Sequence, residues 1–329
     1  MTADDSHLDL IHKSIQSLHA RYLDCDEGKV ATYIPELAKA DPSWFGIAVA
    51  DVQGNVIAHG DCDVEFTIQS ISKAFIFGMA LEEHGRDDVL KHVGVEPSGD
   101  SFNSIELQGD SRPHNAMINA GAIVSTSLIP GKDSNAKVER ILETLSTLAG
   151  RQLRVDETVY RSESDTGHRN RAIAYMLRNV NLLGQDLDEV LDAYFRQCSI
   201  LVTARDLAMM GASLANLGRN PVTGREAMDL YAVRDVLSVM FTCGMYDFAG
   251  SWAFRVGVPA KSGVSGGILA VVNRQLGLSV FSPRLDPMGN SVRGIRVSTD
   301  LADQFGLHVF NFTNMGSTFL HAIKPNASS

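Results

Sequence analysis

The 329-residue sequence has few cysteines and lacks the usual metal and nucleotide motifs. Its cysteines lie far apart, without the C-x-x-C spacing of zinc sites and redox dithiols; they are Cys25, Cys62, Cys198 and Cys243. The histidines form no H-E-x-x-H motif, and neither G-x-G-x-x-G nor G-x-x-x-x-G-K-[ST] occurs. No metal or organic cofactor is therefore indicated. Widely spaced thiols are typical of a reducing compartment, which predicts a cytoplasmic location.

Basic residues and long hydrophobic runs are also scarce. The chain has 29 Lys and Arg against 39 Asp and Glu, a formal net charge of −10. This sign disfavours proteins that neutralise nucleic-acid phosphates or anionic lipid, so no nucleic-acid partner is expected. The longest apolar run, near residues 74–81, is too short to span a bilayer, and the first residues are acidic and polar. Neither membrane insertion nor export is expected.

The sequence contains no internal repeat, low-complexity tract or Gly/Ser/Pro linker, which predicts one compact domain over residues 1–329. Hydrophobic periodicity predicts the main elements. The expected helices are 6–22, several within about 71–245, and a last one from about 290 to 306; the expected strands are 45–50, 56–59, 266–272 and 276–281. Two capping boxes are expected to open helices, Thr203 with Asp206 and Thr223 with Glu226.

The early and late strands are expected to pair, because a two-stranded hairpin is not stable alone. The result is an α+β fold in which one antiparallel sheet is flanked by terminal helices and lies beside a mostly helical subdomain. The sheet subdomain covers approximately 1–70 and 246–329, and the helical subdomain covers approximately 71–245. A cleft is expected where the two meet.

A serine and a lysine at helical spacing, Ser70 and Lys73, carry the first candidate chemistry. Residues i and i+3 share one helix face, and a lysine whose pKa is lowered can activate a serine. The pattern alone is weak, since random placement of the 29 Ser and 9 Lys gives about 0.8 such matches. A second copy, Ser134 with Lys137, is expected in a polar turn, whereas the apolar residues 74–77 predict that Lys73 is buried. On spacing alone, Ser70 is equally an N-terminal helix cap and Lys73 a surface amine.

A second motif, P-A-K-S-G-V-S-G-G at 259–267, leads into a predicted strand. Small residues after Lys261 let the backbone approach a ligand, and N–H groups of an edge strand could bind an oxyanion. A glycine-rich strand entry without any function gives the same pattern. Together with S-x-x-K, the K-S-G motif resembles the motif set of penicillin-recognising serine enzymes.

Longer segments make the resemblance closer. The chain resembles the serine-dependent glutaminases, glutamine amidohydrolases with a β-lactamase/DD-peptidase-like fold. The matching segments, in order, are G-K-V-A-T-Y-I-P-E-L at 28–37, F-T-I-Q-S-I-S-K at 66–73, E-P-S-G-D-S-F-N-S at 96–104, M-I-N-A-G-A at 117–122, R-S-E at 161–163, R-N-R-A-I-A at 169–174, Y-F at 194–195 with Cys198 and Ser199, C-G-M-Y at 243–246 and P-A-K-S-G-V-S-G-G-I at 259–268.

The resemblance implies a role for each matching position. Ser70 would be the nucleophile and Lys73 its base, Tyr194 or Tyr246 would shuttle protons, and the backbone N–H groups of Ser70 and Val264 would form the oxyanion hole. The residues implied to hold the substrate are Tyr33, Ser70, Asn119, Glu163, Asn170, Tyr194, Tyr246 and Val264, and those implied to support them are Lys261, Ser262 and Gly263. Glu163 suits an ammonium group, and amides and phenols suit a carboxylate. The family usually has a proline where this chain has Ala116, which is expected to loosen the loop before Asn119.

The implied activity is hydrolysis of L-glutamine to L-glutamate and ammonia through a glutamyl-serine ester, without a cofactor. The resemblance further implies a homo-oligomer, a dimer or homotetramer, and activation by phosphate. Two alternatives stay open at this point: a β-lactamase or penicillin-binding enzyme, which shares the serine, the lysine and the K-S-G motif, and a catalytically silent module that binds glutamine.

Overall fold

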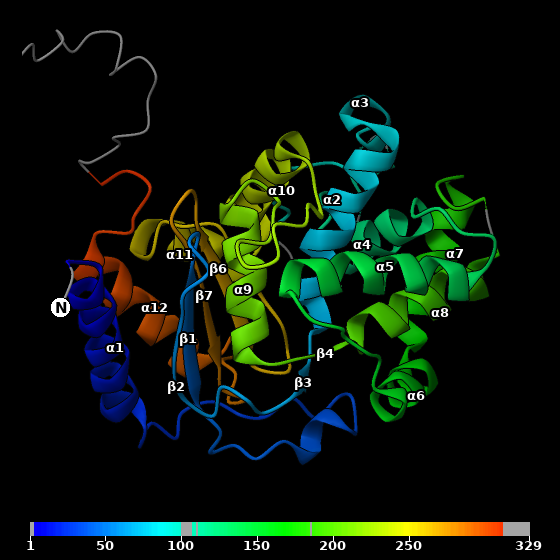
Figure 1. Cartoon of the computed structure of the whole chain (residues 1–329). Coiled ribbons are helices and arrows are strands. Elements are labelled where there is room, and N and C mark those ends of the chain that lie inside the picture. The colour runs from blue at the N-terminus through cyan, green and yellow to red at the C-terminus, as the bar shows by residue number, and fades with distance from the viewer. Residues whose placement is uncertain (1–2, 100–106, 110, 185, 312–329) are drawn as a thin grey trace, which may run out of the picture.

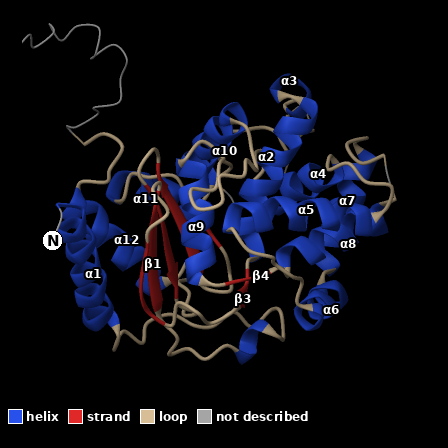
Figure 2. Cartoon of the chain, in the orientation of Figure 1, coloured by secondary structure: helices blue, strands red, loops and turns tan. Residues whose placement is uncertain are grey.

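A computed structural model describes residues 3–99, 107–109, 111–184 and 186–311. One antiparallel sheet stands beside a group of helices (Figures 1 and 2). The helices are α1 Ala3–Tyr22, α2 Ser72–His84, α3 Arg86–Val89, α4 Asn119–Ser127, α5 Ser134–Ala149, α6 Glu157–Thr166, α7 His168–Asn179, α8 Leu187–Cys198, α9 Ala204–Ala215, α10 Leu230–Cys243, α11 Ala249–Arg255 and α12 Val292–Phe305. Short 3₁₀ turns cover Leu37–Lys39 (η1), Gln69–Ile71 (η2) and Tyr246–Phe248 (η3).

The sheet has five strands in the order β2-β1-β7-β6-β5, all antiparallel. The strands are β1 Gly46–Asp51, β2 Val56–Gly60, β5 Ala260–Ser262, β6 Gly267–Val272 and β7 Leu276–Phe281; a separate two-stranded pair is formed by β3 Phe66–Thr67 and β4 Leu201–Val202. The prediction that early and late strands share one sheet is confirmed, because β1 pairs with β7. The sequence pattern missed β5, whose three residues are too few to show alternation.

Side chains alternate between the two faces of the sheet, as the strand period requires. Ile47 and Val49 of β1 pack in one cluster with residues of α1 and α12, whereas Ala48 and Ala50 pack in another cluster with residues of α9. The small alanines match a close approach of α9. A Cβ at Gly277 of β7 would lie 2.2 Å from the backbone oxygen of Ala208, so only glycine fits there.

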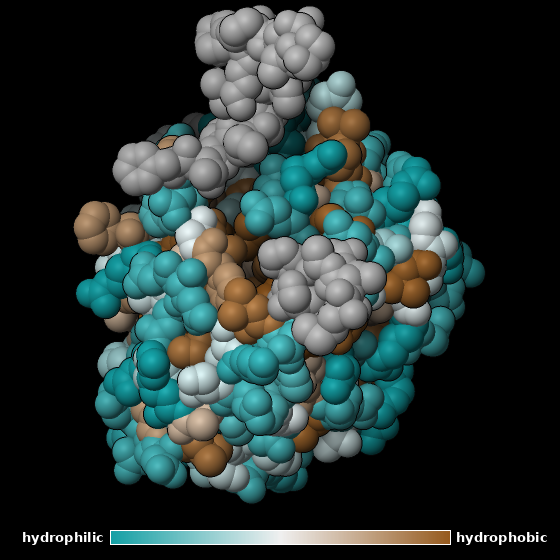
Figure 3. Space-filling model, turned by 60° about the vertical axis from the view of Figure 1, so that its left-hand side comes forward, coloured by the Kyte–Doolittle hydropathy of each residue, from teal (hydrophilic) through white to brown (hydrophobic). Residues whose placement is uncertain are grey.

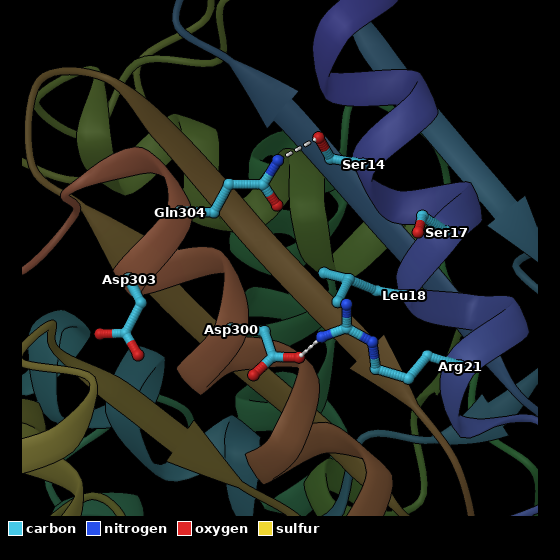
Figure 4. A pocket seen from close by; sticks show the side chains of 7 residues that line it. All are labelled: Ser14, Ser17, Leu18, Arg21, Asp300, Asp303 and Gln304. Carbon is cyan, nitrogen blue, oxygen red and sulfur yellow. Dashed lines mark hydrogen bonds and ion pairs between the residues drawn. The ribbon is translucent and has the colours of Figure 1, made fainter.

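The two terminal helices lie side by side on the outer face of the sheet, as predicted. Residues of both helices line a pocket of about 530 Å³, and Figure 4 shows their side chains. Gln304 of α12 donates to Ser14 of α1 over 2.7 Å, and Arg21 of α1 pairs with Asp300 of α12 at 2.8 Å. These contacts join the beginning of the described chain to its end.

Helix α2 is buried along most of its length, as its apolar sequence predicts. Every residue from Ser72 to Leu81 is buried, including Lys73. The helix contacts α4 and α10, and its N-terminal end faces the turn that joins β5 to β6. The Lys73 amine, which is charged in water, therefore lies inside the core, where it needs hydrogen-bond partners.

One of the two predicted capping boxes is wrong. Thr203 and Asp206 form the predicted box at the start of α9. Residues 223–226 form a loop instead, in which the Asn220 side chain accepts the backbone N–H groups of Val222 and Thr223. Helix α10 begins only at Leu230, because the Asp229 carboxylate accepts the N–H groups of Tyr231 and Ala232.

The expectation of a polar turn at Ser134 to Lys137 is also wrong. Asp133 accepts the N–H of Ala136 over 2.9 Å and thereby opens α5 at Ser134. Lys137 is buried, and its Nζ donates to the backbone oxygens of Ser127 (3.0 Å) and Ile129. The lysine donates to backbone carbonyl groups at and just after the C-terminal end of α4.

Most of the face shown in Figure 3 is hydrophilic, and its hydrophobic side chains form several separate patches. Within the described ranges, no helix combines the length and the apolar character needed to cross a membrane.

Candidate active site

Residues from both parts of the fold line a cavity of about 290 Å³ near the N-terminal end of α2. Six of the predicted site residues are among them: Tyr33, Ser70, Asn119, Glu163, Asn170 and Tyr194. The other lining residues are Ile34, Gln69, Thr166, Gly167, Arg169 and Cys198. Residues distant in the sequence thus meet at one cavity, where the cleft was expected.

Ser70 occupies a strained turn directly before α2. It lies in η2, Gln69–Ile71, so α2 itself begins two residues later than the serine. Gln69 has φ = +50°, a conformation that costs a non-glycine residue about 1–3 kcal/mol. The turn leaves Ser70 8% exposed and lining the cavity. Strain of this kind occurs where a side chain must be presented to a ligand.

Lys73, three residues after the serine, is completely buried. Its Nζ donates to Asn119 Oδ1 over 2.6 Å and, more weakly, to the backbone oxygen of Met117 over 3.4 Å. Burial lowers the pKa of Lys73 from its ordinary value to about 8, although Cys198 and Glu163 nearby oppose this shift. The amine therefore loses its proton close to neutral pH, as a general base requires.

Asn119 connects Lys73 to a second amide. Its Nδ2 donates to Asn170 Oδ1 over 2.8 Å, while its own Oδ1 accepts from Lys73. This chain of hydrogen bonds fixes which atom of each amide faces which neighbour. Asn170, at the end of this chain of hydrogen bonds, lines the cavity, and its Nδ2 group takes no part in the chain.

Tyr246, from the turn η3, contacts Ser70. Its hydroxyl is hydrogen-bonded to the Ser70 side chain and donates to the backbone oxygen of Ser262 over 3.3 Å. Burial raises the pKa of Tyr246 to about 12, so the phenol keeps its proton. Tyr246 also has positive φ, +54°, which makes it a second strained residue at the site.

Lys261 packs against one face of the Tyr246 ring. The Lys261 Nζ lies 3.9 Å from the ring centroid and donates to the backbone oxygen of Ser262 over 2.8 Å. Burial, together with the charge of Lys73, holds the pKa of Lys261 well below its ordinary value. The predicted supporting residues Lys261 and Ser262 thus contact Tyr246, which contacts Ser70.

The turn after β5 lies directly against the turn that holds Ser70. A Cβ at Gly263 would lie 3.0 Å from the backbone oxygen of Ile68 and 3.4 Å from Cβ of Gln69, so glycine permits this approach. The turn is closed by the Gly266 N–H, which donates to the Gly263 oxygen over 2.9 Å and leaves the amide of Val264 outside that bond. The Val264 side chain packs in an apolar cluster with Ile34.

Glu163 supplies the carboxylate of the cavity. It is 9% exposed, and its Oε2 has no hydrogen-bond partner among the described residues. Burial raises the pKa of Glu163 to about 8, against the opposing effects of its hydrogen bond from Gln69 and of the Lys73 charge. A buried, unpartnered carboxylate oxygen is costly unless a ligand such as an ammonium group pairs with it.

Two phenols complete the lining. Tyr194 is buried, and burial raises its pKa well above the ordinary value, so the phenol keeps its proton. Tyr33 is 55% exposed and stands at the solvent side of the cavity. Both predicted phenols therefore line the cavity, Tyr194 in its buried part and Tyr33 at its solvent side.

Sequence reasoning missed several lining residues. Gln69 precedes Ser70 in a segment already singled out, and a polar residue there was a usable signal. Cys198 also lies in a matching segment; its thiol is hydrogen-bonded to Ser72 and Tyr194, and burial raises its pKa. Arg169 begins the matching segment at 169–174, whereas for Thr166 and Gly167 no pattern in the sequence indicated a position at the cavity.

The Asn115 side chain makes two hydrogen bonds in the segment before Asn119. Asn115 Nδ2 donates to the backbone oxygen of Glu96 over 2.8 Å, and Asn115 Oδ1 accepts the Met117 N–H over 2.9 Å. Ala116 is fully buried. The looser loop expected from Ala116 stays a prediction. Residues 100–104 of the matching segment at 96–104 lie outside the described residues.

This geometry can be compared with known proteins. A family model described as Glutaminase matches residues 28–310. The chain belongs to the glutaminase family. It is 54% identical over 295 residues to a glutaminase of Microcystis aeruginosa, an alignment that covers 89% of this chain and 87% of that protein. The chain described here is also similar to the solved structure of Mglu in its glutamate form, with a TM-score of 0.87 and 45% identity. The match covers 91% of this chain and 70% of that chain. A probable glutaminase from Bacillus subtilis, complexed with 6-diazo-5-oxo-L-norleucine, gives a TM-score of 0.81 and 35% identity, and covers 92% of this chain and 96% of that chain.

These findings confirm three predictions made from the sequence: the glutaminase family, the amidohydrolase class and the β-lactamase/DD-peptidase-like α+β fold. The open alternative of a β-lactamase or penicillin-binding enzyme is set aside by the family match. The division into sheet and helical subdomains and the role of each site residue stay predictions.

Proposed function

We propose that this glutaminase hydrolyses L-glutamine to L-glutamate and ammonia through a γ-glutamyl ester on Ser70. The observation that carries the proposal is that Ser70 lines the cavity, is hydrogen-bonded to a buried phenol, and precedes by three residues a buried lysine with a pKa of about 8. The chemistry needs a base that is neutral near physiological pH and an acid that is protonated there. Lys73 and Tyr246 meet these two requirements.

Glu163 and the amides orient the substrate. The ammonium group of glutamine would pair with the unpartnered Oε2 of Glu163, and Asn170 and the phenol groups would donate to its α-carboxylate. Structures of relatives support this assignment: one is described in its glutamate form, and another contains 6-diazo-5-oxo-L-norleucine, which has the carbon chain and the α-amino acid group of glutamine. The substrate's side-chain amide would then lie over Ser70.

Acylation begins when the Ser70 hydroxyl gives its proton to Lys73 Nζ and its oxygen attacks the amide carbon. The negative oxygen of the tetrahedral intermediate is held by the N–H groups of Ser70 and Val264; the close approach of the Gly263 turn to Gln69 supports this pairing. The C–N bond breaks as the amide nitrogen receives a proton through Tyr246, which is re-protonated from Lys73. Ammonia leaves and the serine ester remains.

Deacylation repeats these steps with water. Lys73 accepts a proton from the attacking water, the ester bond to Ser70 breaks, and the serine oxygen recovers a proton. Glutamate is released and the enzyme returns to its first state. Lys261, which packs under the Tyr246 ring, holds that ring in place through both half-reactions.

The test is incubation of Ser70→Ala with glutamine, with ammonia and glutamate measured together. The proposal requires turnover to disappear while glutamate binding, measured by calorimetry, persists. Substantial turnover in Ser70→Ala would overturn the serine ester. Binding of glutamine by the wild type without any turnover would instead favour the silent binding module.

We also propose the finer properties that the family resemblance implies. The four cysteines are free thiols, which supports a cytoplasmic location. A homo-oligomer, a dimer or a homotetramer, and activation by phosphate are the corresponding proposals for assembly and regulation. Light scattering with and without phosphate, in parallel with the ammonia assay, tests both; a monomer of unchanged activity under all conditions would contradict them.

A further inference from the structure

Tyr246 has a strained backbone, and strain of this kind persists only where neighbouring groups hold it in place. The residue has φ = +54° and begins η3, directly after Gly244 and Met245. The Gly244 N–H donates to Met240 O over 3.0 Å and continues the hydrogen bonding of α10. The Met245 oxygen accepts the Phe248 N–H over 3.1 Å and closes the 3₁₀ turn. Neither a helix nor a 3₁₀ turn uses a positive φ, so the strained residue needs support from outside this segment.

Asn290 contacts this segment from 45 residues away in the sequence. Its Nδ2 donates to Met245 O across a long hydrogen bond of 3.5 Å. The preceding residue, Gly289, also lies there: a Cβ on it would be 4.0 Å from Cε2 of Tyr246 and 3.7 Å from Cγ1 of Val264. The turn that carries Asn290 therefore lies beside both the phenol and the residue whose N–H is assigned to the oxyanion hole.

The turn around Asn290 is closed by its own hydrogen bonds. Asp286 Oδ1 accepts the N–H groups of Met288 and Asn290, each over 2.9 Å. The Asp286 N–H donates to Asn290 O over 2.8 Å, and the Gly289 N–H donates to Asp286 O over 3.0 Å. All of these bonds use backbone groups and the Asp286 carboxylate. They do not depend on the Asn290 side chain, so a change of that side chain leaves the turn its own support.

Stability does not explain an asparagine at position 290. Asn290 is fully buried, and its Oδ1 has no hydrogen-bond partner among the described residues. An amide oxygen buried in this way costs free energy that an apolar side chain of similar size would avoid. Asn220 is equally buried, but its Nδ2 donates to Leu148 O over 3.0 Å. Its Oδ1 accepts the N–H groups of Val222 and Thr223. The fold thus uses both ends of the Asn220 amide and only the nitrogen end of Asn290.

We propose that Asn290 is a positioning residue for the acid of the reaction: it holds Met245 O, so that the Tyr246 phenol stays directed at Ser70. The inference rests on the proposed function, in which Tyr246 protonates the leaving nitrogen of glutamine. Asn290 is not among the residues that line the cavity, so it acts through Tyr246 rather than on the substrate. A displacement of about 1 Å can cost about 10²-fold in rate, so the loss of one supporting contact has a measurable effect.

The first test compares two substrates that differ in their need for an acid. The nitrogen of glutamine must be protonated to leave, whereas the 4-nitrophenolate of L-glutamate γ-(4-nitrophenyl) ester leaves without a proton. Asn290→Leu is expected to lower kcat/KM by about tenfold or more for glutamine and by less than about threefold for the ester. Tyr246→Phe is the reference and should show the same selectivity. Equal losses for both substrates, or no loss for glutamine, would overturn the proposal.

Asn220→Leu is the matched control. It removes hydrogen bonds at both ends of a buried amide, so we expect the melting temperature to fall by about 2 °C or more, with wild-type kcat/KM for both substrates. Asn290→Leu is expected to keep or raise the melting temperature, because it removes an unpaired buried oxygen. If Asn290→Leu does not fold, Asn290→Ala repeats the comparison. A selective loss of glutamine turnover in Asn220→Leu as well would show that the effect is not particular to Asn290 and would overturn the proposal.

The position of the phenol can also be measured without turnover, by ¹⁹F NMR of the full chain labelled with 3-fluorotyrosine. Tyr246→Phe identifies the Tyr246 resonance. Asn290→Leu is expected to shift or broaden this resonance, and Asn220→Leu is expected to leave it in place. An unchanged Tyr246 resonance in Asn290→Leu would overturn the inference. A shifted resonance together with a fully active Tyr246→Phe would count against the proposed function and support the positioning contact.

Discussion

Two S-x-x-K segments of this chain share a pattern and a buried lysine, yet they serve different purposes. Lys73 is fully buried and Lys137 is 4% exposed, so burial does not distinguish them. Their partners do. The Lys73 amine bonds to a side-chain amide, Asn119 Oδ1, at a cavity that also holds Ser70. The Lys137 amine bonds to backbone oxygens of Ser127 and Ile129.

This difference teaches how to interpret a buried lysine. Backbone carbonyls at a helix end are fixed parts of the fold, and a lysine that bonds them stabilises that end. An asparagine that lines a cavity and continues to a second asparagine connects its lysine to whatever the cavity binds. The first arrangement predicts an effect on stability, and the second predicts an effect on reaction.

The largest expected effect is that of Ser70→Ala, which removes the nucleophile. We expect kcat/KM for glutamine to fall by about 10³-fold or more, with an unchanged melting temperature. The ammonia assay and circular dichroism measure the two quantities. The corresponding change in the other segment, Ser134→Ala, is the control and should retain wild-type kcat/KM.

Lys73→Met should be nearly as severe as Ser70→Ala, because a nucleophile and its base act as a unit. We expect a fall in kcat of about 10³-fold, and a Ser70→Ala/Lys73→Met double variant no worse than either single one. Multiplicative losses in the double variant would show that the two residues act independently.

The pH dependence sharpens the role of the buried charges. Protonated Lys73 cannot accept a proton, and protonated Glu163 cannot hold an ammonium group; both have a pKa of about 8. We therefore expect kcat/KM to rise with pH up to about 8, with a slope approaching about two in the logarithm at lower pH. Glu163→Gln should lower kcat/KM and reduce that slope to about one. A profile that is flat below pH 8 would contradict this assignment.

Lys137→Met should show the opposite behaviour. The backbone oxygen of Ile129, just after α4, loses its Lys137 donor, and an unsatisfied buried acceptor costs about 1–3 kcal/mol. Urea denaturation should therefore show a free energy of unfolding lower by about that amount, with kcat/KM within about twofold of wild type. A large loss of activity at unchanged stability would remove the distinction between the two lysines.

The smallest expected effect is that of Ser134→Ala on stability. Its backbone N–H is held by Glu189, and Asp133 supplies the helix cap, so the hydroxyl of Ser134 is not what opens α5. We expect a change in the free energy of unfolding of less than about 0.5 kcal/mol by urea denaturation. A loss above about 1 kcal/mol would show that the serine is part of the cap.

Local patterns predicted the parts of the fold that depend on neighbours in sequence. The apolar face around Ile15 and Leu18, the alternation in β1 and the Thr203 box each require only a few adjacent residues. The Thr223 box failed because the same spacing also suits a turn, and Asn220, outside the motif, decides between the two. Lys137 was wrongly predicted to lie in a polar turn. Its partners, the backbone oxygens of Ser127 and Ile129, lie outside the S-x-x-K pattern, so the pattern could not indicate that the lysine is buried.

The candidate site could be predicted only in part, and for the same reason. The resemblance indicated Ser70, Glu163 and Tyr194 as members of one site, and all three line one cavity. It could not indicate that Lys261 of β5 packs on the ring of Tyr246 in η3, or that Gln69 of η2 is strained, because these depend on how segments distant in sequence pack together. A sequence pattern also cannot predict the pKa of Lys73 or Glu163, because several elements together bury each of these side chains.

The pairing of β1 with β7 has a consequence for how the chain matures. Ala48 faces Ser279 in the ladder, so the central strand pair joins the first quarter of the chain to its last quarter. During synthesis, β1 leaves the ribosome long before its partner, and the edge later covered by β7 is exposed for most of translation. Contacts of such long sequence separation form slowly. An incomplete chain therefore holds Ser70 without the β5 turn beside it, and the enzyme acquires its site only in the last stage of folding.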